Sequence, residues 1–156
     1  MMGIWLFMHI IGAVLFIGNI IMAAYWKLGA DRSGNLAVIH KSASDVMRAD
    51  YVFTIPGIAL LLTSGHVMAD QYGYDIFSWS WLGISYGLLI LSGVLWAVVL
   101  LPTQRRMIRE AALSLQQNRL TEGYRKASMR WNAFGSVATI LPLTVLLLMV
   151  FKRLPW

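Results

Sequence analysis

The sequence predicts an all-α protein whose four membrane-spanning helices pack into one bundle. Four stretches of the 156-residue chain contain no Asp, Glu, Lys or Arg, and they cover residues 3–26, 51–69, 76–104 and 131–151. A bilayer core takes about 20 apolar residues of helix to cross, and a charged side chain at its centre is costly. We therefore expect spans at residues 3–26, 51–69, 78–102 and 131–151, within a single membrane domain of residues 1–156.

The composition agrees with this fold class. Hydrophobic residues make up 58% of the chain, which is above the share of about 45–50% in a soluble domain. Four spans use more than half of the residues and leave no room for a second domain. The chain has no cysteine, which excludes disulfides, thiolate metal sites, iron–sulfur clusters and thiol catalysis.

The distribution of the net charge of +6 predicts the orientation of the bundle. Basic residues crowd the first and third connections, whereas the second connection carries only Asp70 and Asp75. Because Lys and Arg mark the cytoplasmic side of short loops, we expect both termini outside, in a bacterial inner membrane. The basic connections would then face anionic lipid headgroups, and the same distribution argues against a role in nucleic-acid binding.

The two basic connections are expected to be helical in part. Residues 36–48 follow a Ser33-Gly34-Asn35 turn, and residues 103–119 repeat apolar side chains at helical spacing. The second stretch either prolongs the third span or lies along the headgroups. We expect both to be solvated connectors that hold the topology. The aromatic residues of 70–81 are explained by the preference of Tyr and Trp for the bilayer interface.

Polar and small residues recur at spacings of three and four on one face of every span, which predicts that these faces meet inside the bundle. On the first span this face runs from Trp5 through His9, Gly12, Phe16 and Asn19 to Trp26, and the third span aligns Ser85, Ser92, Trp96 and Thr103. We call a set of these inward polar residues the polar seam. It consists of Asn19, Asp50, Thr54, Asn132 and Ser136.

His9 carries most of the functional argument, because an ionisable residue inside a span needs a partner and indicates a functional site by default. Its imidazole is compatible with a structural hydrogen bond to a neighbouring helix, with axial ligation of haem b iron, and with a quinone or proton site. For haem, Gly12 would clear space for the porphyrin. His66 and Met68 lie at a similar depth and are the candidates for a second ligand, so a metal site would use His9 and His66.

The first span resembles a family of bacterial predicted integral membrane proteins of unknown function over residues 9–19, and the resemblance continues through residues 50–57, 130–132 and 148–152. This family is similar in layout to HemJ-type protoporphyrinogen oxidases and to CopD-like copper-resistance proteins, which also open with a His-containing span. The resemblance implies a haem-ligand role for His9. The HemJ type also uses a Lys in the third span and an Asn-Glu-x-Pro element in the last. Neither is present here, because no Lys lies between Ile76 and Thr103 and Asn132 is followed by Ala133.

The leading hypothesis is a small inner-membrane b-type haem protein that passes electrons between the quinone pool and a periplasmic partner. One alternative is a non-enzymatic accessory or scaffold subunit of a larger membrane complex or a homo-oligomer, because the sequence holds no complete catalytic constellation. Another is a small-solute or metal permease that works through the polar seam. Whether the protein is an enzyme stays open.

Overall fold

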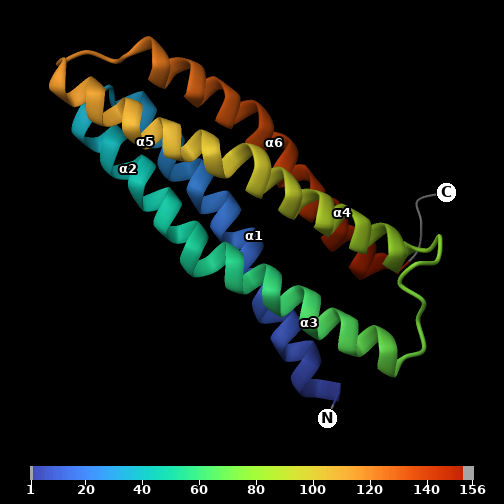
Figure 1. Ribbon diagram of the computed structural model, residues 1–156. Coiled ribbons are helices and arrows are strands. Elements are labelled where there is room, and N and C mark those ends of the chain that lie inside the picture. The colour runs from blue at the N-terminus through green and yellow to red at the C-terminus, as the bar shows by residue number, and fades with distance from the viewer. Residues whose placement is uncertain (1, 153–156) are drawn as a thin grey trace.

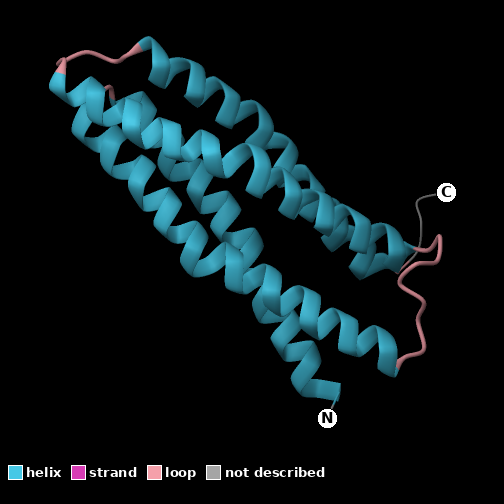
Figure 2. Cartoon of the chain, in the orientation of Figure 1, coloured by secondary structure: helices cyan, strands magenta, loops and turns pink. Residues whose placement is uncertain are grey.

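The computed structural model describes residues 2–152, which are helical except for short connections (Figure 1, Figure 2). In chain order the elements are α1 (Met2–Ser33), α2 (Leu36–Ala49), a π-helical segment η1 (Asp50–Thr54), α3 (Ile55–Gln71), α4 (Trp81–Leu95), a second π-helical segment η2 (Trp96–Leu100), α5 (Leu101–Gln116) and α6 (Glu122–Phe151). Four continuous helical rods result, because α2, η1 and α3 join, as do α4, η2 and α5. Each rod is long and apolar enough to cross a membrane, which confirms the predicted four-span helical bundle.

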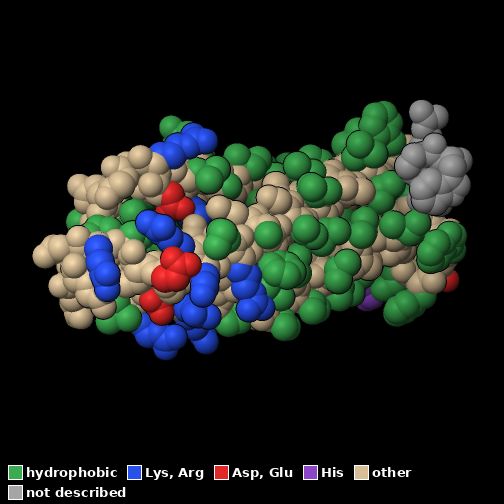
Figure 3. All heavy atoms as spheres, turned by 90° about the horizontal axis from the view of Figure 1, so that it is seen from above, with side chains coloured by type: hydrophobic (Ala, Val, Ile, Leu, Met, Phe, Trp, Pro, Cys, Tyr) green, Lys and Arg blue, Asp and Glu red, His purple; other side chains and the backbone are tan. Residues whose placement is uncertain are grey.

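The bundle has two chemically different ends. The basic end holds the connections at residues 34–35 and 117–121, and the aromatic end holds the connection at residues 72–80. In Figure 3, Lys and Arg side chains gather toward one end while hydrophobic side chains cover much of the rest. A rod of 36 residues is about 54 Å long, well beyond the roughly 30 Å of a hydrocarbon core. The rods therefore extend out of the hydrocarbon at the basic end, where the charges lie.

The prediction that the basic connections are solvated connectors holds for one face of each and fails for the other. The Lys and Arg side chains of α2 and α5 are exposed, whereas the apolar faces of these helices are buried. Helices α2 and α5 pack against each other, α2 also packs on α1, and α5 also packs on α6. The buried core between them includes Ile39, Val46, Met107, Ala111 and Tyr124. The apolar side chains at helical spacing in residues 103–119 thus form a packing face, and α5 prolongs the third span as a rod.

Each π-helical segment ends two residues before a proline. Pro56 follows η1 and Pro102 follows η2, each at the start of the next α-helix. Proline lacks an N–H, and its ring clashes with the carbonyl four residues earlier. A wider π-helical turn accommodates both effects without breaking the rod. The two prolines are therefore each accompanied by a local change of helical register, and these changes begin at Asp50 and at Trp96.

Helices α1 and α3 approach closely where Gly12 and Gly57 face each other. A Cβ atom on Gly12 would lie 2.9 Å from the Leu60 Cβ and 3.0 Å from the Gly57 carbonyl oxygen, and one on Gly57 would lie 2.9 Å from the Phe16 nitrogen. Small residues permit such close packing of helices in membranes. This contact corrects the role expected of Gly12, because the space beside it is filled by α3 and leaves no room for a porphyrin.

We predict that Gly12→Ala destabilises the protein by about 1–3 kcal/mol, since the added methyl group forces the two backbones apart. Gly18→Ala is the matched control on the same helix, because a Cβ there meets nothing within 4 Å. Thermal unfolding in detergent, followed by circular dichroism, measures both variants. Equal melting temperatures for the two variants would contradict the close packing of α1 on α3.

Candidate functional site

A large apolar cavity lies at the aromatic end, where α3 diverges from α4 and α6 (Figure 1). Its volume is about 820 Å³, within the range of about 300–1,000 Å³ found for ligand and cofactor sites. Exposed side chains of α1 and α6, including Val14 and Val150, also line it. The cavity therefore opens sideways onto an apolar surface that lipid would cover, and the buried cluster of Phe16, Leu61 and Leu89 closes its inner side.

His9 lies in the wall of this cavity and is held by α3. Its Nδ1 lies 3.0 Å from the Ser64 Oγ, and the Ser64 hydroxyl itself donates to the Leu60 carbonyl. A serine has a single hydroxyl hydrogen, so the Nδ1–H of His9 must be the donor to Ser64. The other ring nitrogen, Nε2, is then unprotonated and carries a lone pair. It makes no side-chain hydrogen bond among residues 2–152.

Gly65 sets the position of the imidazole ring. A Cβ on this residue would lie 3.1 Å from the His9 Cε1 and 3.4 Å from its Nδ1, so the ring can rest on α3 only because a glycine stands there. The Nδ1 edge of the ring therefore faces α3. The structure thus fixes the orientation of the His9 ring, and the hydrogen bonds of Ser64 favour the tautomer with a proton on Nδ1.

The other candidates for the aromatic-end site divide between the cavity and the surface. Met68 lines the same cavity as His9, on α3, whereas His66 is exposed and outside the lining. The structure therefore brings His9 and Met68 to one cavity and does not bring His66 to it. Two further residues at this cavity were not singled out from the sequence: Met149 on α6, and Lys152, where α6 ends.

A second polar site lies inside the bundle, where the Asp50 carboxylate accepts four hydrogen bonds. Its Oδ1 accepts from Asn19 Nδ2 at 2.8 Å and from Thr54 Oγ1 at 3.0 Å. Its Oδ2 accepts from Gln104 Nε2 at 2.8 Å and from Trp96 Nε1 at 3.1 Å. Asp50 is only 5% exposed. The network joins three of the four rods and confirms that Asn19, Asp50 and Thr54 meet inside the bundle.

An interior cavity of about 250 Å³ adjoins this network. Asn132 and Ser136 of α6 line it, which brings the last two members of the polar seam to the same place. Phe16 lines both this cavity and the one at the aromatic end, so its ring lies between them. Sequence patterns do not single out Gln104. It is the last residue of the charge-free stretch 76–104 and lies beyond the expected span of residues 78–102.

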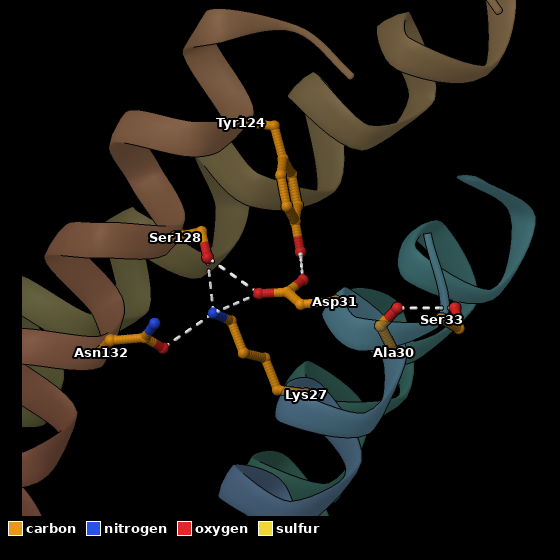
Figure 4. Close-up of polar contacts among 7 residues, drawn as sticks. All are labelled: Lys27, Ala30, Asp31, Ser33, Tyr124, Ser128 and Asn132. Carbon is orange, nitrogen blue, oxygen red and sulfur yellow. Dashed lines mark hydrogen bonds and ion pairs between the residues drawn. The ribbon is translucent and has the colours of Figure 1, made fainter. Parts of the chain in front are cut away.

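A buried lysine forms a third polar cluster, toward the basic end of the bundle (Figure 4). Lys27 is 2% exposed, and its Nζ lies 2.7 Å from Asp31 Oδ2 and donates to Asn132 Oδ1 at 2.7 Å and to Ser128 Oγ at 2.5 Å. The Tyr124 hydroxyl donates to Asp31 Oδ1 at 2.6 Å. The cluster therefore fastens α1 to α6.

Near the basic end, the inward face of α1 lies one residue away from the face that the sequence spacing predicts. Trp26 was expected on that face but is exposed, and Lys27 takes its place. The spacing of four from Asn19 through Ala23 to Lys27, with Asp31 one turn further, was the available signal. Because Lys27 also adjoins the charge-free stretch, it fits the rule that basic residues mark the cytoplasmic end of a span.

We predict that Asp31→Asn destabilises the protein by about 3 kcal/mol, because it leaves the charge of Lys27 buried without its counter-charge. The exposed pair of Lys41 and Asp45 on α2 has the same i,i+4 spacing and supplies the control. Asp45→Asn should change stability by at most about 0.5 kcal/mol. Thermal unfolding in detergent compares them. A similar effect of both substitutions would show that the Lys27 ion pair is not a special contact.

The comparisons with known proteins identify the family and leave the activity open. A family model described as "Predicted integral membrane protein (DUF2269)" matches residues 4–153, and this description names no ligand or reaction. No curated protein and no solved structure matches the chain. The similarity in layout to HemJ-type and CopD-like proteins stays a prediction. Because the family model covers nearly the whole chain, the protein belongs to this family of predicted integral membrane proteins.

Proposed function

We propose that the protein binds haem b in the aromatic-end cavity, with His9 Nε2 as an axial ligand, and carries electrons in a bacterial inner membrane. The observation that carries the proposal is the tautomer of His9. Its Nδ1–H is used by Ser64, so the Nε2 lone pair is available to a ligand. Metal-ligating histidines characteristically donate their other ring N–H to a neighbouring group, which fixes the ring and raises its basicity.

The remaining residues of the cavity suit a large apolar cofactor with acidic groups. Its lining is mostly aliphatic and aromatic, and its sideways opening offers a route from the bilayer. Lys152 is the charged residue in the lining, and its ammonium group would pair with a propionate. Haem, when bound, supplies one-electron transfer.

A second axial ligand would come from the wall that faces His9. Met68 belongs to α3, the helix on which the His9 ring rests, whereas Met149 belongs to α6 on the other side of the cavity. Because Met149 comes from a different helix from the one that holds the His9 ring, Met149 would hold the group together with His9, ahead of Met68. His66, being exposed, is not part of the proposed site.

The lateral opening also favours a second candidate, a quinone bound in the same cavity. His9 Nε2 would then accept a hydrogen bond from a quinol hydroxyl. The two candidates differ in what the purified protein carries. Haem gives an intense visible spectrum, whereas a quinone leaves the protein colourless and appears in an organic extract.

We predict that protein purified in mild detergent from haem-sufficient cells shows a Soret band, and that His9→Ala abolishes it because no other histidine reaches the cavity. His66→Ala is the matched control and should leave the spectrum unchanged, since His66 is exposed on the neighbouring helix. Absorption spectroscopy and haem extraction measure both. A colourless wild type, or a Soret band that survives His9→Ala, would sink the haem proposal.

We also predict that Ser64→Ala lowers haem affinity by roughly 10- to 100-fold, because it removes the acceptor that orients His9. Thr63→Ala is the control on the same helix, since this exposed hydroxyl bonds only to carbonyls of its own helix. Haem titration and the reduction potential of the bound haem provide the readouts. Matching titration curves for the two variants would exclude Ser64 as the orienting residue.

A further inference from the structure

We propose that the interior cavity beside Asp50 is a second ligand site, and that it takes a small organic ammonium ion. The proposal is independent of haem, because it concerns another cavity, on the far side of Phe16 from His9. It rests on three observations. The Asp50 carboxylate has no ion-pair partner, the Gln104 amide oxygen has no hydrogen-bond partner, and aromatic side chains line the cavity beside them.

The carboxylate of Asp50 is buried and has no cation beside it. Each oxygen accepts two hydrogen bonds, and all four donors are neutral groups that bring no positive charge to it. Within residues 2–152 no Lys, Arg or His forms an ion pair with Asp50, and Lys27 is paired with Asp31. A buried charge is costly unless an opposite charge accompanies it.

Gln104 supplies an atom that lacks a partner next to that charge. The residue is 4% exposed and lines the cavity, and its Oε1 makes no hydrogen bond. The orientation of this amide follows from Asp50, because a reversed amide would set an oxygen against the carboxylate. A buried acceptor without a donor costs about 1–3 kcal/mol. A ligand with N–H groups would satisfy it.

The size and lining of the cavity indicate the class of cation. A volume of about 250 Å³ equals that of roughly eight water molecules, far more than a bare metal ion fills. Calcium requires six to eight oxygen ligands, whereas Gln104 Oε1 is the one buried side-chain oxygen without a partner among the described residues that line this cavity. Phe16 and Trp96 line the cavity, and aromatic faces attract ammonium groups. Trp131 also lines it, but its ring already faces the Lys27 ammonium, 5.5 Å from the ring centroid. These features together favour a small amine in its charged form.

The cavity lies close to the outer surface of the bundle. Ser136 lines it and is nevertheless exposed on α6.

The test is titration of the purified wild-type protein in detergent with ethylammonium chloride, by calorimetry and by thermal unfolding, against NaCl and KCl at equal ionic strength. We expect saturable heat and a rise in melting temperature with ethylammonium alone. No saturable response would overturn the proposal. An equal response to potassium would also overturn it, because the site would then accept an inorganic ion.

Two variants connect the binding to this cavity. Gly135→Leu adds a side chain to the lining, where a Cβ meets only Trp131 atoms at 3.7 Å or more, and should weaken ethylammonium binding at least tenfold. Gly87→Leu is the control, since this exposed glycine has open space around it. Asp50→Asn should abolish binding. If it fails to fold, Gly135→Leu decides, and wild-type affinity in that variant would refute the site. His9→Ala should leave ethylammonium binding unchanged.

Discussion

The buried carboxylate of Asp50 is the constraint around which the bundle is built. In a low-dielectric interior an ionised group needs a full set of donors, and no single helix can supply them. Asp50 draws on Asn19 from α1, Trp96 from η2 and Gln104 from α5. Three rods are thereby fixed in one relative register. The two π-helical segments begin at Asp50 and at Trp96, so the changes in helical register occur where these side chains must be aimed.

This constraint divides the molecule into a closed half and an open half. From Asp50 toward the basic end, the rods share a continuous buried core, and the Lys27 cluster adds a second polar fastening between α1 and α6. Toward the aromatic end no comparable polar network links α3 to α4 and α6 in the described chain, and the helices separate around the large cavity. Stability therefore resides mainly in the closed half, which leaves the open half free to accommodate a ligand.

Much of this arrangement is predictable, because a bilayer imposes strong rules on sequence. Charge-free length predicts the four rods, and helical spacing predicts that Asn19, Asp50 and Thr54 meet. The residues that the sequence does not predict correctly, or does not identify, have physical reasons for this. Lys27 fits two patterns equally well. It can mark the cytoplasmic end of a span, and it continues the helical spacing of the inward face of α1. A glycine such as Gly12 permits a ligand or a neighbouring helix to approach, and sequence does not distinguish the two. Gln104 reaches Asp50 only because the third rod continues beyond the membrane core.

The two cavities share a feature that structural needs do not explain. A buried polar atom without a partner costs about 1–3 kcal/mol, and this bundle provides Asp50 with four donors. It nevertheless leaves Gln104 Oε1 and Trp131 Nε1 beside the interior cavity without partners, and His9 Nε2 makes no side-chain hydrogen bond among the described residues. If His9 served packing alone, an apolar side chain in its place would avoid the cost. The amide of Gln104 donates its N–H to Asp50, but its oxygen remains without a partner. Unpartnered atoms in a well-satisfied network therefore indicate where ligands complete the structure.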